Sequence, residues 1–125
     1  AMTSYGATIL EHFRRPRNHR RLESPSVARE AYNPLCGDRV RIELTIDDDA
    51  IGSAAFTANA CAICTASASL LTERLAGMSV NGALQIQEEE IVAALGSDVP
   101  AGRRACATLP WNAMRQGLAE FRDRG

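Results

Sequence analysis

Lysine is absent from this sequence of 125 residues, and the 14 strongly basic residues are all arginine. Without lysine, no side chain can form a Schiff base with a carbonyl substrate. Aromatic residues are also scarce, at 5%, although apolar residues together make up 46% of the chain. Small and aliphatic side chains must therefore fill the core of a single domain, which we place at residues 1–125. Ala1, which precedes Met2, is interpreted as the remnant of an expression tag.

Long apolar runs and a strong net charge are missing as well. No run approaches the roughly 18 apolar residues of a membrane-spanning helix, and the formal net charge is only −1. This balance predicts neither nucleic acid nor a membrane surface as a partner. Because the N-terminal residues contain no apolar signal core, we expect a cytoplasmic protein. Its four cysteines then favour metal binding or thiol chemistry over a disulfide framework.

The N-terminal region is expected to form a short helix followed by a surface loop. Tyr5, Ile9 and Phe13 are spaced four residues apart, as on one face of a helix, and Pro16 ends that helix. The loop that follows, residues 14–21, is rich in arginine. We predict an exposed patch whose role is either solubility or docking to an acidic face of a partner. Its members are Arg14, Arg15, Arg17, Arg20 and Arg21.

The middle of the sequence predicts a small antiparallel sheet. Residues 39–46 alternate strictly between polar and apolar side chains, which is the clearest strand pattern in the chain. Three aspartates at 47–49 mark a turn, and residues 50–58 return as the second strand of a hairpin. Residues 28–33 are expected to supply a third strand.

The second half of the sequence is helical in its spacing. The helical period begins at Ala62, and Gly77 is a natural end for that helix. Ser79 is predicted to cap a further short helix that reaches Ile86, and two more helices are predicted at residues 88–95 and 103–122. Pro110 must lie in the first turn of the last helix or kink it. The order of elements predicts an α+β domain in which a small antiparallel sheet packs against several helices.

Three cysteines occupy positions that a normal packing of these elements can bring together. Cys36 lies in the tight loop "NPLCGD", Cys61 lies where the hairpin ends and a helix begins, and Cys106 lies at the start of the last helix. Helix N-termini lower the pKa of a thiol, and thiolates bind zinc or iron. From spacing alone three readings stay open: a shared metal site, redox-active thiols such as the C-x-x-C pair of Cys61 with Cys64, or inert core cysteines.

Residues 65–69 are all very small, which is unusual for a core helix. We interpret them as a means of packing backbone segments closely behind a crowded anionic site. Their hydroxyl groups are also candidates for hydrogen bonds to sulfur.

Four motifs in this order resemble the U-type iron–sulfur cluster assembly scaffold family, which comprises IscU, SufU and the N-terminal domain of NifU. The stretch "NPLCGDRVRIEL" is similar to the family's first ligand loop, and "ACAICTASASLLTERLAG" to the start of its central helix. The stretch "RRACATLPWNAMRQGL" resembles the ending of SufU. The N-terminal stretch "EHFRRPRNHRRLE" matches the family pattern at His12, Pro16, Arg17, Asn18 and Leu22.

The resemblance implies a NifU/IscU-like fold and a set of four ligands. The three ligand cysteines of the family fall on Cys36, Cys61 and Cys106, and its aspartate falls on Asp38. The same three thiols are the candidate sulfur acceptors. Cys64 stands where the family usually has serine, so it inherits no role; it is either a spare ligand or acceptor, or a small buried residue.

The resemblance also implies a function and partners. The expected function is a scaffold, not an enzyme, that receives sulfur from a cysteine desulfurase, holds a transient [2Fe–2S] cluster and transfers it to apo iron–sulfur proteins. The first alternative is a SufU-like sulfur acceptor that depends on Zn²⁺, and the second is a structural zinc module. The chain lacks the L-P-P-V-K segment of IscU that docks a heat-shock chaperone, so that partner is not expected. It also lacks the insertion typical of SufU between Cys61 and Cys106.

Overall fold

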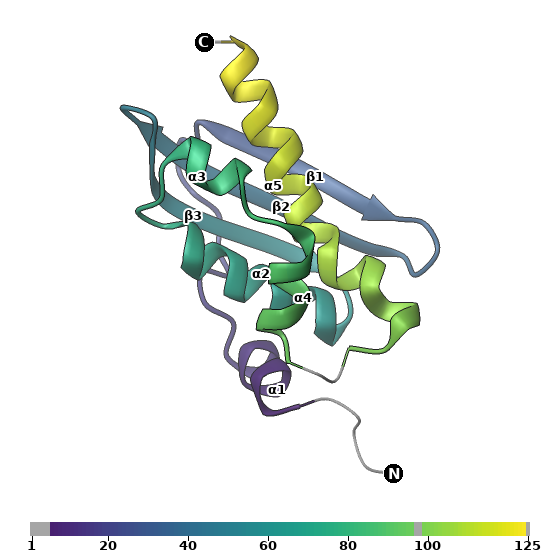
Figure 1. Ribbon diagram of the computed structural model, residues 1–125. Helices are drawn as coiled ribbons and strands as arrows, with labels where there is room; N and C mark the ends of the chain where they lie inside the picture. The colour runs from purple at the N-terminus through teal and green to yellow at the C-terminus, as the bar shows by residue number, and fades with distance from the viewer. Residues whose placement is uncertain (1–5, 97–98, 125) are drawn as a thin grey trace.

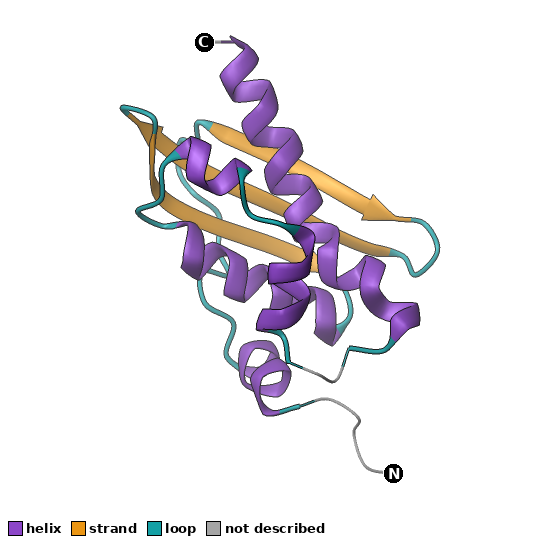
Figure 2. Ribbon diagram, in the orientation of Figure 1, coloured by secondary structure: helices purple, strands orange, loops and turns teal. Residues whose placement is uncertain are grey.

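The computed structural model, which describes residues 6–96 and 99–124, contains a three-stranded antiparallel sheet and helices that cover one of its faces (Figures 1 and 2). The strands lie in the order β1-β2-β3. Their bounds are β1 (Val27–Asn33), β2 (Asp38–Asp47) and β3 (Ala50–Asn59). The predicted α+β class and all three predicted strands are therefore confirmed.

Outside the sheet, the regular elements of the described chain are five α-helices and one short 3-10 turn. In Figure 2 the helices α2 to α5 lie in front of the sheet, and α1 lies beyond its lower edge. No helix in the described residues is long and apolar enough to cross a membrane. The bounds are α1 (Ala7–Arg14), α2 (Ala62–Leu75), α3 (Val80–Leu84), α4 (Glu88–Ala94), the 3-10 turn (Ala101–Arg103) and α5 (Arg104–Arg124).

The central helix α2 is buried on nearly every side. Between Ile63 and Ser69 every residue is buried, and the exposed charged residues Glu73 and Arg74 lie only in its last turn. It packs against α1, α5, β3 and α4. A helix enclosed in this way must carry small side chains wherever neighbouring segments approach its backbone. The structure thus agrees with the interpretation of the small residues as a device for close packing.

One detail of the predicted helices is wrong, and for Pro110 the alternative of a kink stays a prediction. Phe13 does not share a buried face with Ile9, since Phe13 is 44% exposed and the buried residues of α1 are Ile9 and His12; Tyr5 lies outside the described residues. Pro110 lies in the second turn of α5, beyond the first turn. The helix continues past Pro110, which has no N–H to donate to the carbonyl of Cys106 four residues earlier.

The segment between α1 and β1 crosses the far side of the sheet (Figure 1). It first pairs with the outer edge of β3, where the N–H of Arg20 donates to Phe56 O at 3.0 Å. It then covers Glu43, a carboxylate that is only 1% exposed. Arg21 and Arg41 donate to Glu43 Oε2, each at 2.7 Å, and the N–H of Leu22 donates to Oε1. Burial alone would raise the pKa of Glu43, but these hydrogen bonds outweigh it and hold that pKa below its ordinary value.

The arginine patch is exposed at four of its five predicted members, and three of the five, Arg15, Arg17 and Arg21, form ion pairs within the chain. Arg14, Arg15 and Arg20 are exposed. Arg17 is only partly exposed and pairs with Glu11 at 3.1 Å. Because Arg21 binds Glu43, its side chain fastens the crossing segment and is not freely available to a partner.

Gly117 marks the closest approach of α5 to the sheet and gives a test of this packing. A Cβ atom built there would lie 2.6 Å from Val27 Cγ1 and 3.2 Å from Arg29 Cβ. We expect Gly117→Ala to lower the free energy of unfolding by about 1 kcal/mol, because overpacking outweighs the gain in helix propensity. Urea denaturation measures the change. Gly102→Ala, where no atom lies within 4 Å of the added Cβ, is the control, and a Gly117→Ala protein as stable as this control would contradict the packing.

Candidate metal centre

The loop between β1 and β2 places Cys36 and Asp38 at one end of the sheet. The side chain of Asn33 accepts from the N–H of Leu35 at 3.0 Å, and its carbonyl accepts from the N–H of Gly37 at 2.8 Å. Gly37 has φ +77°, a backbone conformation that a residue with a Cβ rarely adopts. This turn leaves Cys36 exposed and makes Asp38, which is buried, the first residue of β2.

Cys61 brings the N-terminus of α2 to the same place. It is the N-cap residue of α2, and its backbone N–H donates to Asp38 Oδ1 at 3.0 Å. The Asp38 carboxylate therefore lies at the positive end of the α2 dipole, which favours negative charge there. The side chain of Cys61 is partly exposed.

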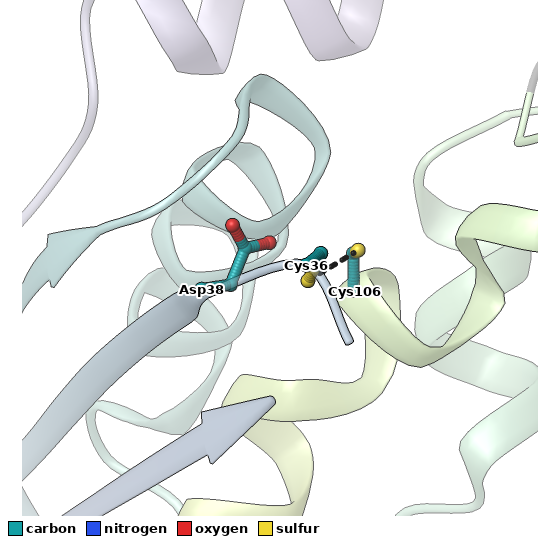
Figure 3. Close-up of side chains that lie close together, drawn as sticks. All are labelled: Cys36, Asp38 and Cys106. Carbon is teal, nitrogen blue, oxygen red and sulfur yellow. Dashed lines mark hydrogen bonds between the residues drawn. The ribbon is translucent and has the colours of Figure 1, made fainter. Parts of the chain in front are cut away.

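Cys106 completes a compact group of donor atoms. It is the third residue of α5, is 2% exposed, and its Sγ lies 3.4 Å from Cys36 Sγ. One ligand atom from each of Cys36, Asp38 and Cys106 lies within 4.8 Å of the other two. Figure 3 shows the two sulfurs joined by a hydrogen bond, with the Asp38 carboxylate beside them.

The four predicted ligands are thus brought together only in part. Within the described ranges, the sulfur of Cys61 is not a member of this group. Cys61 joins the site through its backbone N–H, which holds Asp38. Coordination of a metal by these residues stays a prediction.

The electrostatics of the group oppose ionisation of its buried thiol. Burial raises the pKa of Cys106 to about 12, and the hydrogen bond with Cys36 and the negative charges of Cys61 and Asp38 act in the same direction. Several groups that each become negative at one point cannot all ionise without a compensating cation. A bound cation reverses this balance, because metal coordination deprotonates a thiol outright.

Asp38 has a buried oxygen that nothing in the protein satisfies. Its Oδ2 atom is buried, and among the described residues it is the only buried side-chain oxygen or nitrogen with no hydrogen-bond partner. A buried charged oxygen without a partner costs several kcal/mol, so such atoms usually coordinate a ligand. The donor chemistry fits: two thiols and a carboxylate match zinc or an iron–sulfur cluster.

The hydroxyl groups of α2 do not serve the site as predicted. Ser67 donates to the carbonyl of Ala107, and Ser69 bonds to His12, so in the described part of the chain no hydrogen bond joins these hydroxyls to a sulfur. For Ser67 and Ser69 the expectation of bonds to sulfur is wrong, because neighbouring segments bind these two hydroxyls. Cys64 is buried in the first turn of the same helix, three residues after its N-cap residue Cys61.

A polar contact between α1 and α2 was not predicted from the sequence. His12 Nδ1 lies 2.7 Å from Ser69 Oγ, which also accepts from the N–H of Arg17 at 2.8 Å. Burial and the positive charge of Arg17 lower the pKa of His12, which favours its neutral ring in this contact. The only available signal was a histidine three residues after Ile9, on the buried side of a short helix.

Comparison with known proteins identifies one family over nearly the whole chain. A family model described as the NifU-like N-terminal domain matches residues 4–125. Three relatives of known name are similar to this chain at 31–36% identity.

The relatives differ in how much of their own length the chain covers. The zinc-dependent sulfurtransferase SufU of Bacillus subtilis is 31% identical, over 94% of this chain and 91% of its own length. The iron–sulfur cluster assembly scaffold protein IscU of Streptococcus pyogenes is 33% identical, over 91% of this chain and 82% of its own length. The bifunctional protein NifU/MnmA of Rubrobacter xylanophilus is 36% identical over 96% of this chain, which spans only 25% of that relative.

A solved structure supports the fold independently. The N-terminal NifU-like protein of Brucella abortus superposes with a TM-score of 0.80 and covers 96% of this chain and 95% of its own. At 20% identity this likeness concerns the fold alone. The predicted NifU/IscU-like fold is confirmed.

Alkylation tests the arrangement of the four thiols without reference to any function. With its pKa near 12, Cys106 is a thiolate in about one molecule in ten thousand at pH 8. In metal-free protein at pH 8 we expect iodoacetamide to modify exposed Cys36 first and buried Cys64 and Cys106 at least about a hundredfold more slowly. Peptide mass spectrometry measures the order. In denaturant all four thiols should react alike, and rapid modification of Cys106 in the folded protein would contradict the site geometry.

Proposed function

This chain belongs to the family of NifU-like N-terminal domains, and from that premise we propose that it is a scaffold for the assembly and transfer of a [2Fe–2S] cluster. Sulfur reaches it from a cysteine desulfurase, and the cluster leaves to apo iron–sulfur proteins in the cytoplasm. The observation that carries the proposal is the buried, partnerless Asp38 Oδ2 beside the thiols of Cys36 and Cys106. In this role the chain is a carrier and not an enzyme.

Exposure ranks the three candidate sulfur acceptors. Cys36 is exposed, Cys61 is partly exposed and Cys106 is buried, so the first two are the thiols that a persulfide can reach. The acceptor thiolate attacks the outer sulfur of the desulfurase persulfide. The sulfur–sulfur bond of that persulfide breaks, its electron pair leaves with the desulfurase cysteine, and the outer sulfur becomes the persulfide of the acceptor.

The cluster is the cargo of this site, and its ligands are Cys36, Asp38, Cys61 and Cys106. Three thiolates suit iron well, whereas a carboxylate oxygen is a harder ligand and holds iron in a cluster less firmly. Asp38 is fixed at Oδ1 by the N–H of Cys61, which leaves Oδ2 to bind and to release. A site with one weak ligand suits a protein that must give its cluster away.

A second candidate function is a zinc-dependent sulfur acceptor of a cysteine desulfurase. It is favoured by the likeness to the zinc-dependent sulfurtransferase SufU, which extends over 91% of that relative's length. The same four residues, Cys36, Asp38, Cys61 and Cys106, would hold the zinc ion in a tetrahedral set. Zinc keeps its bound thiols as thiolates at neutral pH. Cys36 and Cys61 then remain the accessible acceptors.

A structural zinc module is the least favoured alternative. The apolar core lies between the sheet and the helices and includes Phe56, Leu71 and Met114. The candidate ligands lie at the ends of elements, at the edge of that core. A domain of this length does not need a metal to close its core.

One reconstitution experiment separates these functions. The protein is incubated anaerobically with ferrous iron, cysteine and a cysteine desulfurase, with and without zinc. We expect a [2Fe–2S] absorption spectrum that transfers to an apo-ferredoxin. Desulfurase stimulation with zinc and no such spectrum would support the sulfur acceptor instead. If chelation of the metal unfolds the protein, and neither cluster transfer nor desulfurase stimulation is observed, only the structural zinc module remains.

Asp38→Ala tests whether the aspartate is a ligand for release. Three thiolates remain in this variant, and the weaker oxygen ligand is gone. We expect a cluster that persists at least about threefold longer and moves more slowly to an apo-ferredoxin, whereas Cys36→Ala loses its cluster because a strong ligand is removed. Anaerobic cluster absorbance over time, with and without acceptor, measures both. Equally fast loss from the two variants would show that Asp38 is needed for holding and not for release.

A further inference from the structure

Cys64 is a fourth thiol, a buried member of the apolar core, to which the proposed function gives no role. It is the third residue of α2 and has no exposed surface. Cys61, three residues earlier, is the N-cap of the same helix. Residues three apart on a helix share a face, and two cysteines separated by two residues commonly bind the same zinc ion. The sequence spacing and the helix geometry therefore direct both thiols toward one centre.

The first turn of α2, which includes Cys64, lies beside that centre because the N–H of its N-cap residue, Cys61, donates to Asp38 Oδ1 at 3.0 Å. After burial, the largest effects on its thiol come from Asp38, Cys61, Cys106 and Cys36, in that order. These four residues are the candidate ligands themselves. Burial raises the pKa of Cys64, and these four neighbours act in the same direction.

The site thus has five donors for the four positions of a tetrahedral ion. Cys36, Asp38 and Cys106 form the compact group, and the sulfurs of Cys61 and Cys64 both lie outside it. One position is therefore open to either Cys61 or Cys64. An independent observation, the partnerless Oδ2 of Asp38, indicates that a cation belongs at this place.

We propose that Cys64 is a reserve ligand that takes the coordination position of Cys61 when Cys61 leaves the metal. This inference rests on the proposed function, in which an accessible thiol must be free to accept sulfur. As the bond from the metal to Cys61 breaks, Cys64 loses its proton to solvent and forms a new bond from sulfur to the metal. No oxidation occurs, and the number of coordinated thiolates stays the same. Cys61 can then carry sulfur while the metal stays bound.

Zinc titration of the purified protein tests the proposal, with zinc alone as the probe. We expect Cys61→Ala to bind one zinc ion within about tenfold of the wild-type affinity, because Cys64 completes the set of ligands. Cys61→Ala/Cys64→Ser should then lose at least about a hundredfold more affinity. The matched control is Cys61→Ala/Ser67→Ala, which disturbs α2 one turn further on, where Ser67 bonds to Ala107, and which removes no sulfur. It should bind zinc as Cys61→Ala does.

Cobalt substitution gives a second readout that leaves Cys64 unchanged. The thiolate-to-cobalt charge-transfer absorption grows with the number of bound thiolates. Cys61→Ala should therefore keep the full wild-type intensity, with Cys64 in the set. A drop to about two-thirds, or equal zinc loss from Cys61→Ala and from the double variant, overturns the reserve role alone. Failure of the wild-type protein to bind zinc or cobalt overturns the metal site, and the proposed function with it.

Discussion

The enclosure of α2 is the constraint on which the rest of the structure depends. The sheet lies on one side of this helix, and α1, α4 and α5 pack around it, so its residues from Ile63 to Ser69 have almost no contact with water. An enclosed helix can neither carry large side chains on every face nor leave polar atoms unpaired. Its hydroxyls therefore bond to its neighbours, as Ser67 does to Ala107 and Ser69 to His12. These contacts fix the N-terminus of α2, where the candidate metal centre lies.

In the candidate metal centre, Asp38 is less completely hydrogen-bonded than the other deeply buried carboxylate, Glu43. Glu43 is as deeply buried as any carboxylate in the described residues, but two arginines and a backbone N–H satisfy it. Asp38 is buried with one oxygen satisfied and the other not. Glu43 therefore holds the crossing segment in place, whereas Asp38 is poised to bind a ligand. The same residue class serves structure in one place and chemistry in the other, and the difference lies in the hydrogen bonds that each receives.

The candidate donors lie at the ends of helices and strands, and this position affects how a bound metal or cluster could be exchanged. The apolar core is continuous beneath α2 and α5, and the donors lie at a loop tip, a strand start and two helix starts. Ligands on such ends can shift by small amounts without repacking the core. Cys36, on an exposed turn shaped by Gly37, has more freedom than Cys106, which α5 holds in a buried position. A centre that receives and releases its cargo requires this combination of fixed and adjustable ligands.

The sequence by itself determined the elements and the four motifs of this protein, because alternation, helical spacing and turn residues act locally. The strand at residues 39–46, the cap at Ser79 and the positions of Cys36, Cys61 and Cys106 at the ends of elements could all be predicted in this way. Only the tertiary structure decided which donors converge, that Phe13 is exposed, and that the small hydroxyls bind backbone and histidine in place of sulfur. These outcomes depend on contacts between residues 40 to 70 positions apart, such as Cys36 with Cys106, and local sequence patterns carry no information about such distances.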